Sequence, residues 1–492
     1  MLIMKLSHLL APLGLFCPED PEITDLTCDS RSVEPGALFV ALAGAHANGG
    51  DFIPEAAARG AAAVMCAPPA PEGLPAVLTP APRRVLGPLA AEFFGRPADG
   101  MTLIAVTGTK GKTTTAHMIR DILTAAGHKM GMIGTLGAFI GVERLAEGLN
   151  TTPEPITLHR LLRQMADAGC THVVMEVSSQ AMKLHRAEGI TFAAALFLNL
   201  TPDHIGGAEH ADFAEYRACK AALFRQCRLA VGSADDPSWP FMAAQVPSGV
   251  PIRTFGFREG SDIRGIAVTP DGGSRPLSTR FTVAGAAAPY TLPIPGLFNA
   301  ANALAALALC RAMGIGDRAI RTGLAQVSVP GRTQVFPGTG DYTVLIDYAH
   351  NGDSFRALLS ALSGYEHRRL IVVFGAGGDR PRMRREDMAR AAEELADFAV
   401  ITADNPRTEP VEAICRQIAA AMPRLPHSII LDRREAILQA LALARPGDIV
   451  ALLGKGHEEY IEVNGVRTHF SEREVLEDYF SNATLHPAPA IP

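Results

Sequence analysis

Short runs of apolar residues, each ending abruptly in glycine or a polar residue, recur through most of this chain. Runs of about three to six consecutive apolar residues are typical of strands that a parallel sheet buries on both faces. The clearest runs are LIAV (103–106), HVVME (172–176), AAALFL (193–198), TVLID (343–347), LIVVF (370–374), FAVI (398–401) and DIVALL (448–453). Stretches with helical spacing alternate with them, such as NAANALAALALCRAMG (299–314), which Gly314 ends. The alternation predicts an α/β fold with parallel sheets.

The pattern falls into three blocks. A chain of 492 residues is too long for a single hydrophobic core, so we expect each block to form a domain. Residues 1–97 predict a small α/β domain that ends in proline-rich stretches. Residues 98–328 predict a parallel-sheet domain, and residues 329–492 a second, Rossmann-like α/β domain. The first residues, MLIMKLSHLLAPLGLF, predict a short amphipathic helix rather than a signal peptide, because His8 and Pro12 interrupt the apolar run.

Composition narrows the class of protein. A net charge of −6, with no cluster of lysine and arginine among aromatic residues, argues against nucleic acid as a partner. No apolar stretch reaches the roughly 18 residues that a membrane span requires. The eight cysteines are scattered without C-x-x-C spacing, which favours reduced thiols over disulfides or a zinc site. Reduced thiols favour a cytoplasmic protein, and we also expect a monomer.

The segment MTLIAVTGTKGKTTT (101–115) predicts a nucleotide site, because a buried strand leads directly into a glycine-rich turn and a helix. Backbone N–H groups of the turn and the positive end of the helix would hold phosphate oxygens. Lys112 would neutralise phosphate charge, and the Thr113 hydroxyl would hold Mg²⁺. The spacing departs from the standard phosphate loop, because Val106 stands where that pattern has its first glycine. The expected phosphate-binding residues are Gly108, Thr109, Lys110, Gly111, Lys112, Thr113 and Thr114.

Polar residues that follow the other strands of the middle block are candidates for metal and phosphate chemistry. Glu176 comes directly after VVM, where a carboxylate either ligates Mg²⁺ or forms a structural ion pair. His204 follows the next strand, in NLTPDH. Lys220, on a predicted helix, reads by itself as a solvated lysine.

The strands of the third block end in GAGGDR, ADNPR and GKGHE (375–380, 403–407 and 454–458). Ligands of open α/β sheets bind beyond the carboxyl ends of the strands. The Asn405-Pro406 turn would present Arg407 on a rigid corner, where its planar fork matches a carboxylate, and Glu458 suits an ammonium group. Together they predict a clamp for a zwitterionic, amino-acid-like ligand; separately, each would be a surface ion pair.

Taken in order, these motifs closely resemble the Mur ligase family of peptidoglycan synthesis over nearly the whole chain. Further matching segments are DSR (29–31), NTTP (150–153), EVSS (176–179), NAANAL (299–304), PGR (330–332) and DYAH (347–350). The resemblance implies three domains, which bind a UDP-MurNAc precursor (1–97), ATP (98–328) and an amino acid (329–492). It further implies an ATP-dependent ligase that adds meso-diaminopimelate to UDP-MurNAc-L-Ala-D-Glu through an acyl phosphate.

The resemblance assigns each candidate residue a role. The UDP-MurNAc-dipeptide would contact Ser30, Asn150, Thr151, Thr152, Ser179 and Arg186. Lys112, Thr113, Glu176, His204 and a carbamate formed from CO₂ on Lys220 would serve ATP and its Mg²⁺ ions. The adenine, ribose and phosphate would contact Asn299, Asn302, Arg332, Asp347 and His350. Diaminopimelate would contact Arg385, Asp404, Asn405, Pro406, Arg407, Gly454 and Glu458.

Two assignments rest on position alone. Arg385 is assigned by spacing, because PRMRR replaces the family's usual run after GGDR, and His210 is assigned to a family histidine across a longer loop. Three alternatives remain open at this point: a lysine-adding ligase, a folylpolyglutamate synthase of the same fold, and a P-loop ATPase that moves a partner.

Overall fold

The computed structural model describes residues 3–44, 47–202, 205–206, 209–271, 277–337 and 341–485. The chain forms two compact units. The first comprises Met1–Arg264 and Ala305–Ile320, and the second comprises Gly265–Leu304 and Arg321–Pro492. The expected three-domain division at residues 97 and 328 stays a prediction.

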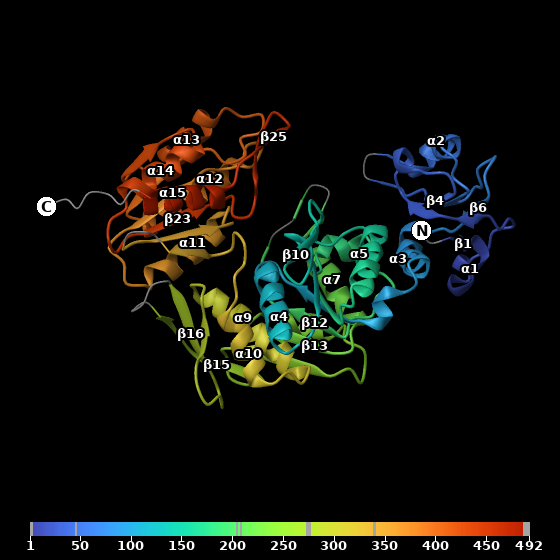
Figure 1. The fold of residues 1–492 in the computed structure, drawn as a ribbon, viewed down its shortest axis with the longest axis horizontal. Coiled ribbons are helices and arrows are strands. Elements are labelled where there is room, and N and C mark those ends of the chain that lie inside the picture. Colours follow the sequence, from blue (N-terminus) through green and yellow to red (C-terminus); the bar gives the residue numbers. More distant parts are fainter. Residues whose placement is uncertain are drawn as a thin grey trace. The chain divides into compact units, whose positions relative to one another are not determined.

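The first unit begins with a four-stranded parallel sheet in the order β3-β4-β5-β6 (Figure 1, blue). Alternate residues of its strands face two separate clusters, since successive side chains point to opposite faces. Helices α1 and α3 pack on one face and α2 on the other. The predicted N-terminal amphipathic helix is confirmed, because Leu6, Leu9 and Leu10 of α1 are buried in the first cluster. The elements are β1 (Met4–Lys5), α1 (Leu6–Leu10), β2 (Glu22–Ile23), β3 (Asp25–Thr27), β4 (Ala37–Val40), α2 (Ile53–Ala58), β5 (Ala63–Cys66), β6 (Ala76–Leu78) and α3 (Pro82–Phe93).

The larger sheet of the first unit has the order β10-β9-β8-β11-β7-β12-β13-β14 and is parallel from β8 through β14. Helices α5 and α7 share one apolar cluster with β7 and β11, while α4 packs against β7, β8 and β11. The strands are β7 (Thr102–Thr107), β8 (Met130–Gly134), β9 (Gly137–Ile140), β10 (Glu143–Ala146), β11 (His172–Glu176), β12 (Ala194–Phe197), β13 (Ala230–Ser233) and β14 (Ile252–Gly256). The helices are α4 (Lys112–Ala125), α5 (Pro155–Asp167), α6 (Ser179–Lys183), α7 (Phe213–Ala222) and α8 (Trp239–Ala243).

Strand β7 lies between β11 and β12, and all three run in the same direction. The chain passes from β7 through α4 to β8 and returns to β11, whereas β12 adds on the other side of β7. Ligands of open parallel sheets bind where the strand order reverses in this way. The segments after β7, β11 and β12 therefore meet at one edge of the sheet.

The second unit contains a six-stranded sheet in the order β18-β19-β23-β20-β21-β22, in which only β18 is antiparallel to its neighbour (Figure 1, orange to red). Helices cover both faces: α11, α12 and α13 share one cluster with Leu370, Val372 and Phe374 of β20, and α14 and α15 share another with Ile371 and Val373. The elements are β18 (Gln334–Pro337), β19 (Thr343–Asp347), α11 (Gly352–Ser363), β20 (Leu370–Phe374), α12 (Arg382–Leu395), β21 (Phe398–Ile401), α13 (Val411–Ala420), β22 (His427–Ile429), α14 (Arg433–Leu443), β23 (Ile449–Leu453), β24 (Tyr460–Val463), β25 (Val466–His469) and α15 (Glu472–Leu485).

The predicted α/β class with parallel sheets is confirmed, and antiparallel hairpins extend it. Strands β15 (Ile263–Asp271), β16 (Ser278–Val283) and β17 (Tyr290–Leu292) pair antiparallel, and helices α9 (Leu297–Ala312) and α10 (Asp317–Ala325) follow them. Within the described part of the chain, no helix combines the length and apolar character that crossing a bilayer demands.

Candidate functional site

The turn after β7 has the geometry of a phosphate-binding loop. Gly111, the residue before α4, has a φ of +85°, a left-handed conformation that favours glycine. Helix α4 begins at Lys112, so its free N–H groups face the turn. The Lys112 Nζ donates to the carbonyls of Gly108 at 2.9 Å and Thr109 at 3.2 Å. The lysine amine and the helix terminus therefore lie at the same turn, as phosphate binding requires.

The segment after β12 braces this loop. The Asn199 side chain accepts from Lys110 N at 2.9 Å and donates to Lys110 O at 3.1 Å. The Thr109 hydroxyl contacts Thr201 O at 3.2 Å and the Tyr216 hydroxyl at 2.9 Å. NLTPDH thus begins beside the phosphate loop, as expected from the order of the strands. Its His204, a predicted metal ligand, lies outside the described residues.

Glu176, at the end of β11, is 2% exposed and points toward the start of α4. Its Oε2 accepts from the Thr113 hydroxyl at 3.0 Å. Adjacent oxygen ligands of octahedral Mg²⁺ also lie about 3 Å apart, so the two predicted ligands fit one magnesium ion. Thr135, which sequence reasoning missed, donates its N–H to Glu176 Oε1 at 2.9 Å and its hydroxyl to Oε2 at 3.2 Å. The sequence offered little reason to select Thr135, because it is a single small polar residue after the short strand β8.

Four of the residues expected to bind the UDP-MurNAc-dipeptide form a connected group. The Thr152 hydroxyl donates to Glu176 O at 2.9 Å, and its carbonyl accepts from Arg186 Nη1 at 3.0 Å. Thr151 lies 3.1 Å from Thr135, hydroxyl to hydroxyl, and Ser179 begins α6 directly after the same strand.

The other two residues of that set are placed differently. Ser30 belongs to the small N-terminal sheet region and donates to Glu55 at 2.7 Å. Asn150 is exposed. Neither one hydrogen-bonds to the connected group among the contacts of the described residues.

Lys220 is buried at the phosphate loop rather than solvated, which corrects the expectation drawn from the helix pattern alone. Its exposed fraction is 2%, and its Nζ donates to Gly108 O at 2.9 Å. The amine also lies 4.8 Å from the centroid of the Tyr216 ring. A lysine on the last turn of α7 reaches this position because the helix packs against the sheet with Tyr216 in the core.

In the second unit, the residues expected around adenine and ribose lie close together. Asn299 donates to Thr333 Oγ1 at 2.9 Å, and Asn302 donates to Asn299 Oδ1 at 3.4 Å. Thr333 N in turn donates to Asp347 Oδ2 at 2.7 Å. Burial raises the pKa of Asp347, while the neighbouring Arg332 guanidinium opposes that rise. The predicted nucleotide residues are thus divided between the two units.

His350 lies just after strand β19, which ends at Asp347. Its Nδ1 lies 2.8 Å from Tyr348 O, and the rings of the two residues are 4.6 Å apart between centroids. It is one of the residues that line the cavity described next.

A cavity of about 610 Å³, including its open mouth, lies beyond the carboxyl ends of β19, β20, β21 and β23. Of the seven residues expected to bind diaminopimelate, all except Pro406 line it. The lining residues include Tyr348, His350, Gly377, Arg380, Arg384, Arg385, Asp404, Asn405, Arg407, Gly454 and Glu458. The predicted clamp residues therefore meet in one concave site.

Arg407 stands at a corner of the backbone, where the sequence predicted it. Arg407 has a φ of +52°, and its N–H donates to Glu462 O at 3.0 Å. Its Nη1 donates to Gly378 O at 2.7 Å. Gly378 allows this approach, because a Cβ there would lie 1.8 Å from Pro406 O. The guanidinium is thereby held at the cavity wall.

Arg385 lines the cavity but already has an acidic partner. It is 1% exposed, and its two terminal nitrogens donate to the Glu409 carboxylate at 2.6 and 3.0 Å. These hydrogen bonds hold the pKa of Glu409 below its usual range. Arg385 also donates to Gly377 O at 3.3 Å. It therefore supports the loop after β20, and Arg380 and Arg384 add further positive charge to the cavity.

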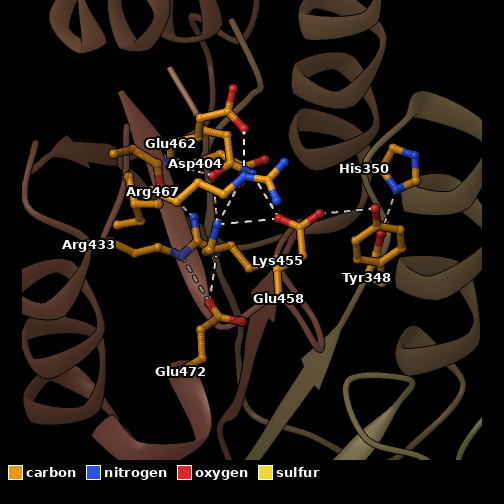
Figure 2. A network of polar contacts seen from close by, with 12 residues as sticks. Tyr348, His350, Asp404, Arg433, Lys455, Glu458, Glu462, Arg467 and Glu472 are labelled. Carbon is orange, nitrogen blue, oxygen red and sulfur yellow. Dashed lines mark hydrogen bonds and ion pairs between the residues drawn. The ribbon is translucent and has the colours of Figure 1, made fainter. Parts of the chain in front are cut away.

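Lys455 is the functional residue that sequence reasoning missed on this side. Although it lies within GKGHE, it had no assigned role. It is fully buried, with Nζ 3.2 Å from Asn405 Oδ1 and 3.4 Å from both Asp404 and Glu458 (Figure 2). Glu458 also accepts from Asn405 Nδ2 at 2.8 Å. The lysine thus orients the acidic and amide groups that were expected to bind the ligand.

Arg433 and Glu472 form a buried ion pair near Lys455 (Figure 2). Arg433, at the start of α14, donates to Glu472 Oε1 at 2.8 and 3.0 Å, and both side chains are fully buried (Figure 2). Arg433 also donates to Ala403 O at 2.6 Å and Leu453 O at 2.8 Å. Those carbonyls directly precede Asp404 and Gly454, so the pair ties two strand ends together beneath the cavity.

Three family models match the chain in the order of its expected parts. Residues 22–93 match the Mur ligase family, catalytic domain; residues 106–310 match the Mur ligase middle domain; and residues 331–456 match the Mur ligase, glutamate ligase domain. The chain is 41% identical to the UDP-N-acetylmuramoyl-L-alanyl-D-glutamate–2,6-diaminopimelate ligase of Gloeobacter violaceus, over 97% of this chain and 98% of that protein. It is 40% identical to the ligase of the same name from Geobacillus thermodenitrificans, over 96% and 98%.

Solved structures agree with this assignment. A structure of a UDP-N-acetylmuramoyl-L-alanyl-D-glutamate–2,6-diaminopimelate ligase matches with a TM-score of 0.69 and 28% identity, covering 94% of this chain and 96% of the other. MurF from Acinetobacter baumannii shares the fold, with a TM-score of 0.66 at 19% identity over 98% of this chain and 100% of that chain. The phosphate loop, the buried Glu176 and the amino-acid cavity thus occur in a chain that belongs to the Mur ligase family, whose members are ATP-dependent amide ligases.

Proposed function

We propose that this protein adds meso-diaminopimelate to UDP-MurNAc-L-Ala-D-Glu, with ATP converted to ADP and phosphate. The observation that carries the proposal is the cavity in which Arg407, Asn405 and Glu458 converge. It offers a fixed guanidinium for a carboxylate and a carboxylate for an ammonium group, as a zwitterionic amino acid needs. The names of the ligases that it resembles at about 40% identity support the same substrates.

The chemical difficulty is that a carboxylate resists attack by an amine. Transfer of the γ-phosphoryl group of ATP to the D-glutamate γ-carboxylate makes phosphate the leaving group. The diaminopimelate amine then attacks the acyl carbon, and phosphate departs as the amide forms. Lys112 and the N–H groups at the start of α4 would stabilise the charge of the transferring phosphoryl group. Mg²⁺, held by Thr113 and Glu176, would neutralise phosphate charge.

The dipeptide substrate would be oriented by the group around Thr152. Thr151, Thr152, Ser179 and Arg186 follow or contact strand β11, which also carries Glu176. The bound precursor would therefore present its glutamate near the phosphate loop, since one strand end supports both sites. Ser30 would bind the distant uridine part.

Arg407 would select diaminopimelate over lysine. The distal carbon of diaminopimelate carries a carboxylate as well as an ammonium group. The side chain of lysine ends in an ammonium group alone, which the guanidinium repels. Binding lysine would also leave the Arg407 fork without its carboxylate partner. A lysine-adding specificity is therefore the less favoured alternative, and a P-loop ATPase that moves a partner would not need an amino-acid cavity.

We further propose that Lys220 is carbamylated by CO₂ and that the carbamate binds metal together with Glu176 and His204. The burial of its amine beside Gly108 O of the phosphate loop supports this proposal. Protein equilibrated with isotope-labelled bicarbonate should show a carbamate carbon resonance that Lys220→Met abolishes. Lys129→Met, which changes an exposed lysine, should keep it. A resonance unaffected by Lys220→Met would contradict the assignment.

The test of the main proposal is phosphate release by the purified chain with ATP, Mg²⁺ and UDP-MurNAc-L-Ala-D-Glu. Release should require meso-diaminopimelate, and lysine at the same concentration should support it far less. Mass spectrometry should find the tripeptide product. Equal turnover with and without the amine acceptor would overturn the ligase assignment, and faster turnover with lysine would overturn the specificity. ATP and UDP-linked precursors are cytoplasmic metabolites, so we place the reaction in the cytoplasm.

A further inference from the structure

A cluster of three different metal-binding side chains lies at the start of α7, outside the group assigned to magnesium. His210 precedes the helix, and Glu215 and Cys219 follow on it. One nitrogen, one oxygen and one sulfur atom from these residues all lie within 4.8 Å of one another. Spacing along the sequence contained no zinc signal, because only the fold brings the three together.

The helix start orients two of the three side chains. Asp212 caps α7 by accepting from Glu215 N at 2.8 Å, and Glu215 in turn accepts from Ala211 N at 2.7 Å. The hydrogen bond from Ala211 N holds the Glu215 carboxylate next to residue 210, and Lys183 Nζ lies 2.8 Å from Glu215 Oε1. Cys219 is four residues further along and lies on the same helix face. The carboxylate and the thiol are thus arranged before any ligand arrives.

His210 supplies the observation that points to a ligand. Its side chain is 1% exposed, and Nε2 lies 2.9 Å from the Ser179 hydroxyl. Among the described residues, nothing hydrogen-bonds to Nδ1, and Glu215 Oε2 lies 4.0 Å from it. A buried ring nitrogen without a partner destabilises the fold. The Glu215 carboxylate lies on the side of this nitrogen, and the Cys219 thiol belongs to the same cluster.

We propose that His210, Glu215 and Cys219 form a binding site for a divalent transition-metal ion, with Zn²⁺ as the ion that suits it best. Imidazole, carboxylate and thiolate are zinc ligands, whereas a thiolate and an imidazole do not suit Mg²⁺. Bond lengths of about 2.0 to 2.3 Å place ligand atoms of tetrahedral zinc about 3.3 to 3.8 Å apart. The ligand atoms now lie within 4.8 Å of one another, and a small shift of the Glu215 carboxylate with rotation of the Cys219 side chain brings them to these separations.

Binding is a ligand exchange. Bonds form from zinc to His210 Nδ1, a Glu215 oxygen and Cys219 Sγ, five of the six waters of the aqueous ion leave for solvent, and the thiol proton passes to water. One water stays as the fourth ligand. No oxidation or reduction accompanies the exchange.

Zinc at this site would inhibit the ligase. The same helix carries Lys220 at the phosphate loop, and His210 contacts Ser179 in the group expected to bind the precursor. A metal that ties residue 210 to the first two turns of α7 would restrict both. Inhibition should persist in excess Mg²⁺, since the donor set discriminates against that ion. The binding itself does not depend on the proposed amino-acid substrate.

The experiment is a titration of the purified full chain, without nucleotide and with its thiols reduced, against Zn²⁺ in competition with a chromophoric chelator. We expect one Zn²⁺ per chain. Cys219→Ala should weaken Zn²⁺ binding at least about tenfold. Removing a residue that only supports a metal ligand already lowers metal affinity by about that factor, and Cys219 is proposed as a ligand itself. Cys28→Ala, which removes an exposed thiol elsewhere, is the matched control and should bind as the unaltered protein does.

Co²⁺ provides a second readout that does not involve catalysis. A thiolate-to-cobalt charge-transfer band should appear in the unaltered protein and in Cys28→Ala, and it should be absent in Cys219→Ala. Zn²⁺ should inhibit the first two proteins and leave Cys219→Ala active. Failure to bind Zn²⁺ stoichiometrically, or equal binding by Cys219→Ala and Cys28→Ala, would overturn the proposal. Because Cys219 is outside the assigned substrate sites, either result leaves the ligase assignment unaffected.

Discussion

Replacing Arg407 by alanine tests how the cavity recognises its amino acid. The backbone at Arg407 is held from both sides, because its N–H donates to Glu462 O at 3.0 Å and its carbonyl accepts from Asn464 N at 2.8 Å. The substitution therefore removes the guanidinium while the corner keeps its contacts. Among the described residues, the side-chain hydrogen bond lost is the one to Gly378 O.

The expected loss follows from the hydrogen bonds that the guanidinium would make. The guanidinium fork would donate two hydrogen bonds to a carboxylate, each worth about 1.5 to 3 kcal/mol, but Arg407 is half-buried, so solvent screens part of its charge. We therefore expect a net loss of about 2 to 3 kcal/mol in diaminopimelate binding. Since about 1.4 kcal/mol corresponds to tenfold, the KM for diaminopimelate should rise about 30- to 140-fold.

The assay is phosphate release with each substrate varied in turn. The KM values for ATP and for UDP-MurNAc-L-Ala-D-Glu should change little, because both are expected to bind elsewhere. Arg416→Ala is the matched control, since this arginine on α13 is 74% exposed and pairs with Glu412 outside the cavity. An equal rise in the KM for ATP and for diaminopimelate, or no rise in either, would refute the role given to Arg407.

Two further predictions concern stability. Glu472→Ala should lower the free energy of unfolding of the second unit by about 3 to 5 kcal/mol, because it leaves the Arg433 guanidinium buried without its carboxylate partner. Denaturant unfolding measures this loss, and the double variant Arg433→Met/Glu472→Leu should lose less stability. An equal loss in the single and double variants would contradict the reasoning. Burial lowers the pKa of His159, aided by Arg96, from 6.5 to about 4, so the folded protein binds fewer protons than the unfolded chain between those values. Stability should therefore fall as the pH drops from 6.5 toward 4, by about 3 kcal/mol in all, and His159→Leu should remove that part of the pH dependence in unfolding curves; an unchanged slope would disprove the assignment.

Local sequence predicted some strands of the two large sheets and missed others. Apolar runs followed by glycine or polar residues predicted β7, β11, β12, β19, β20, β21 and β23, because a parallel strand buried on both faces needs such a run. The antiparallel strands β15, β16 and β17 were not predicted. Their residues alternate or are mixed, so pairing with a neighbouring strand, rather than composition, defines them.

Within the sites, the sequence identified residues whose chemistry is evident from a turn or a strand end, such as Lys112, Glu176 and Arg407. It did not reveal that Lys220 is buried at the phosphate loop, or that Lys455 lies among three polar groups of the cavity. A lysine on a helix or in a glycine turn looks the same whether solvated or buried. Only the packing of the element that carries it decides which is true.

The sequence by itself determined the alternation of strands and helices, the phosphate loop and the polar residues at strand ends, because these follow from short-range spacing and backbone preferences. The tertiary structure alone decided that Arg385 is paired with Glu409, and that His210, Glu215 and Cys219 converge. Contacts of this kind join residues through the docking of a helix or loop onto its neighbours. Their geometry depends on how the whole unit packs, which no local pattern encodes.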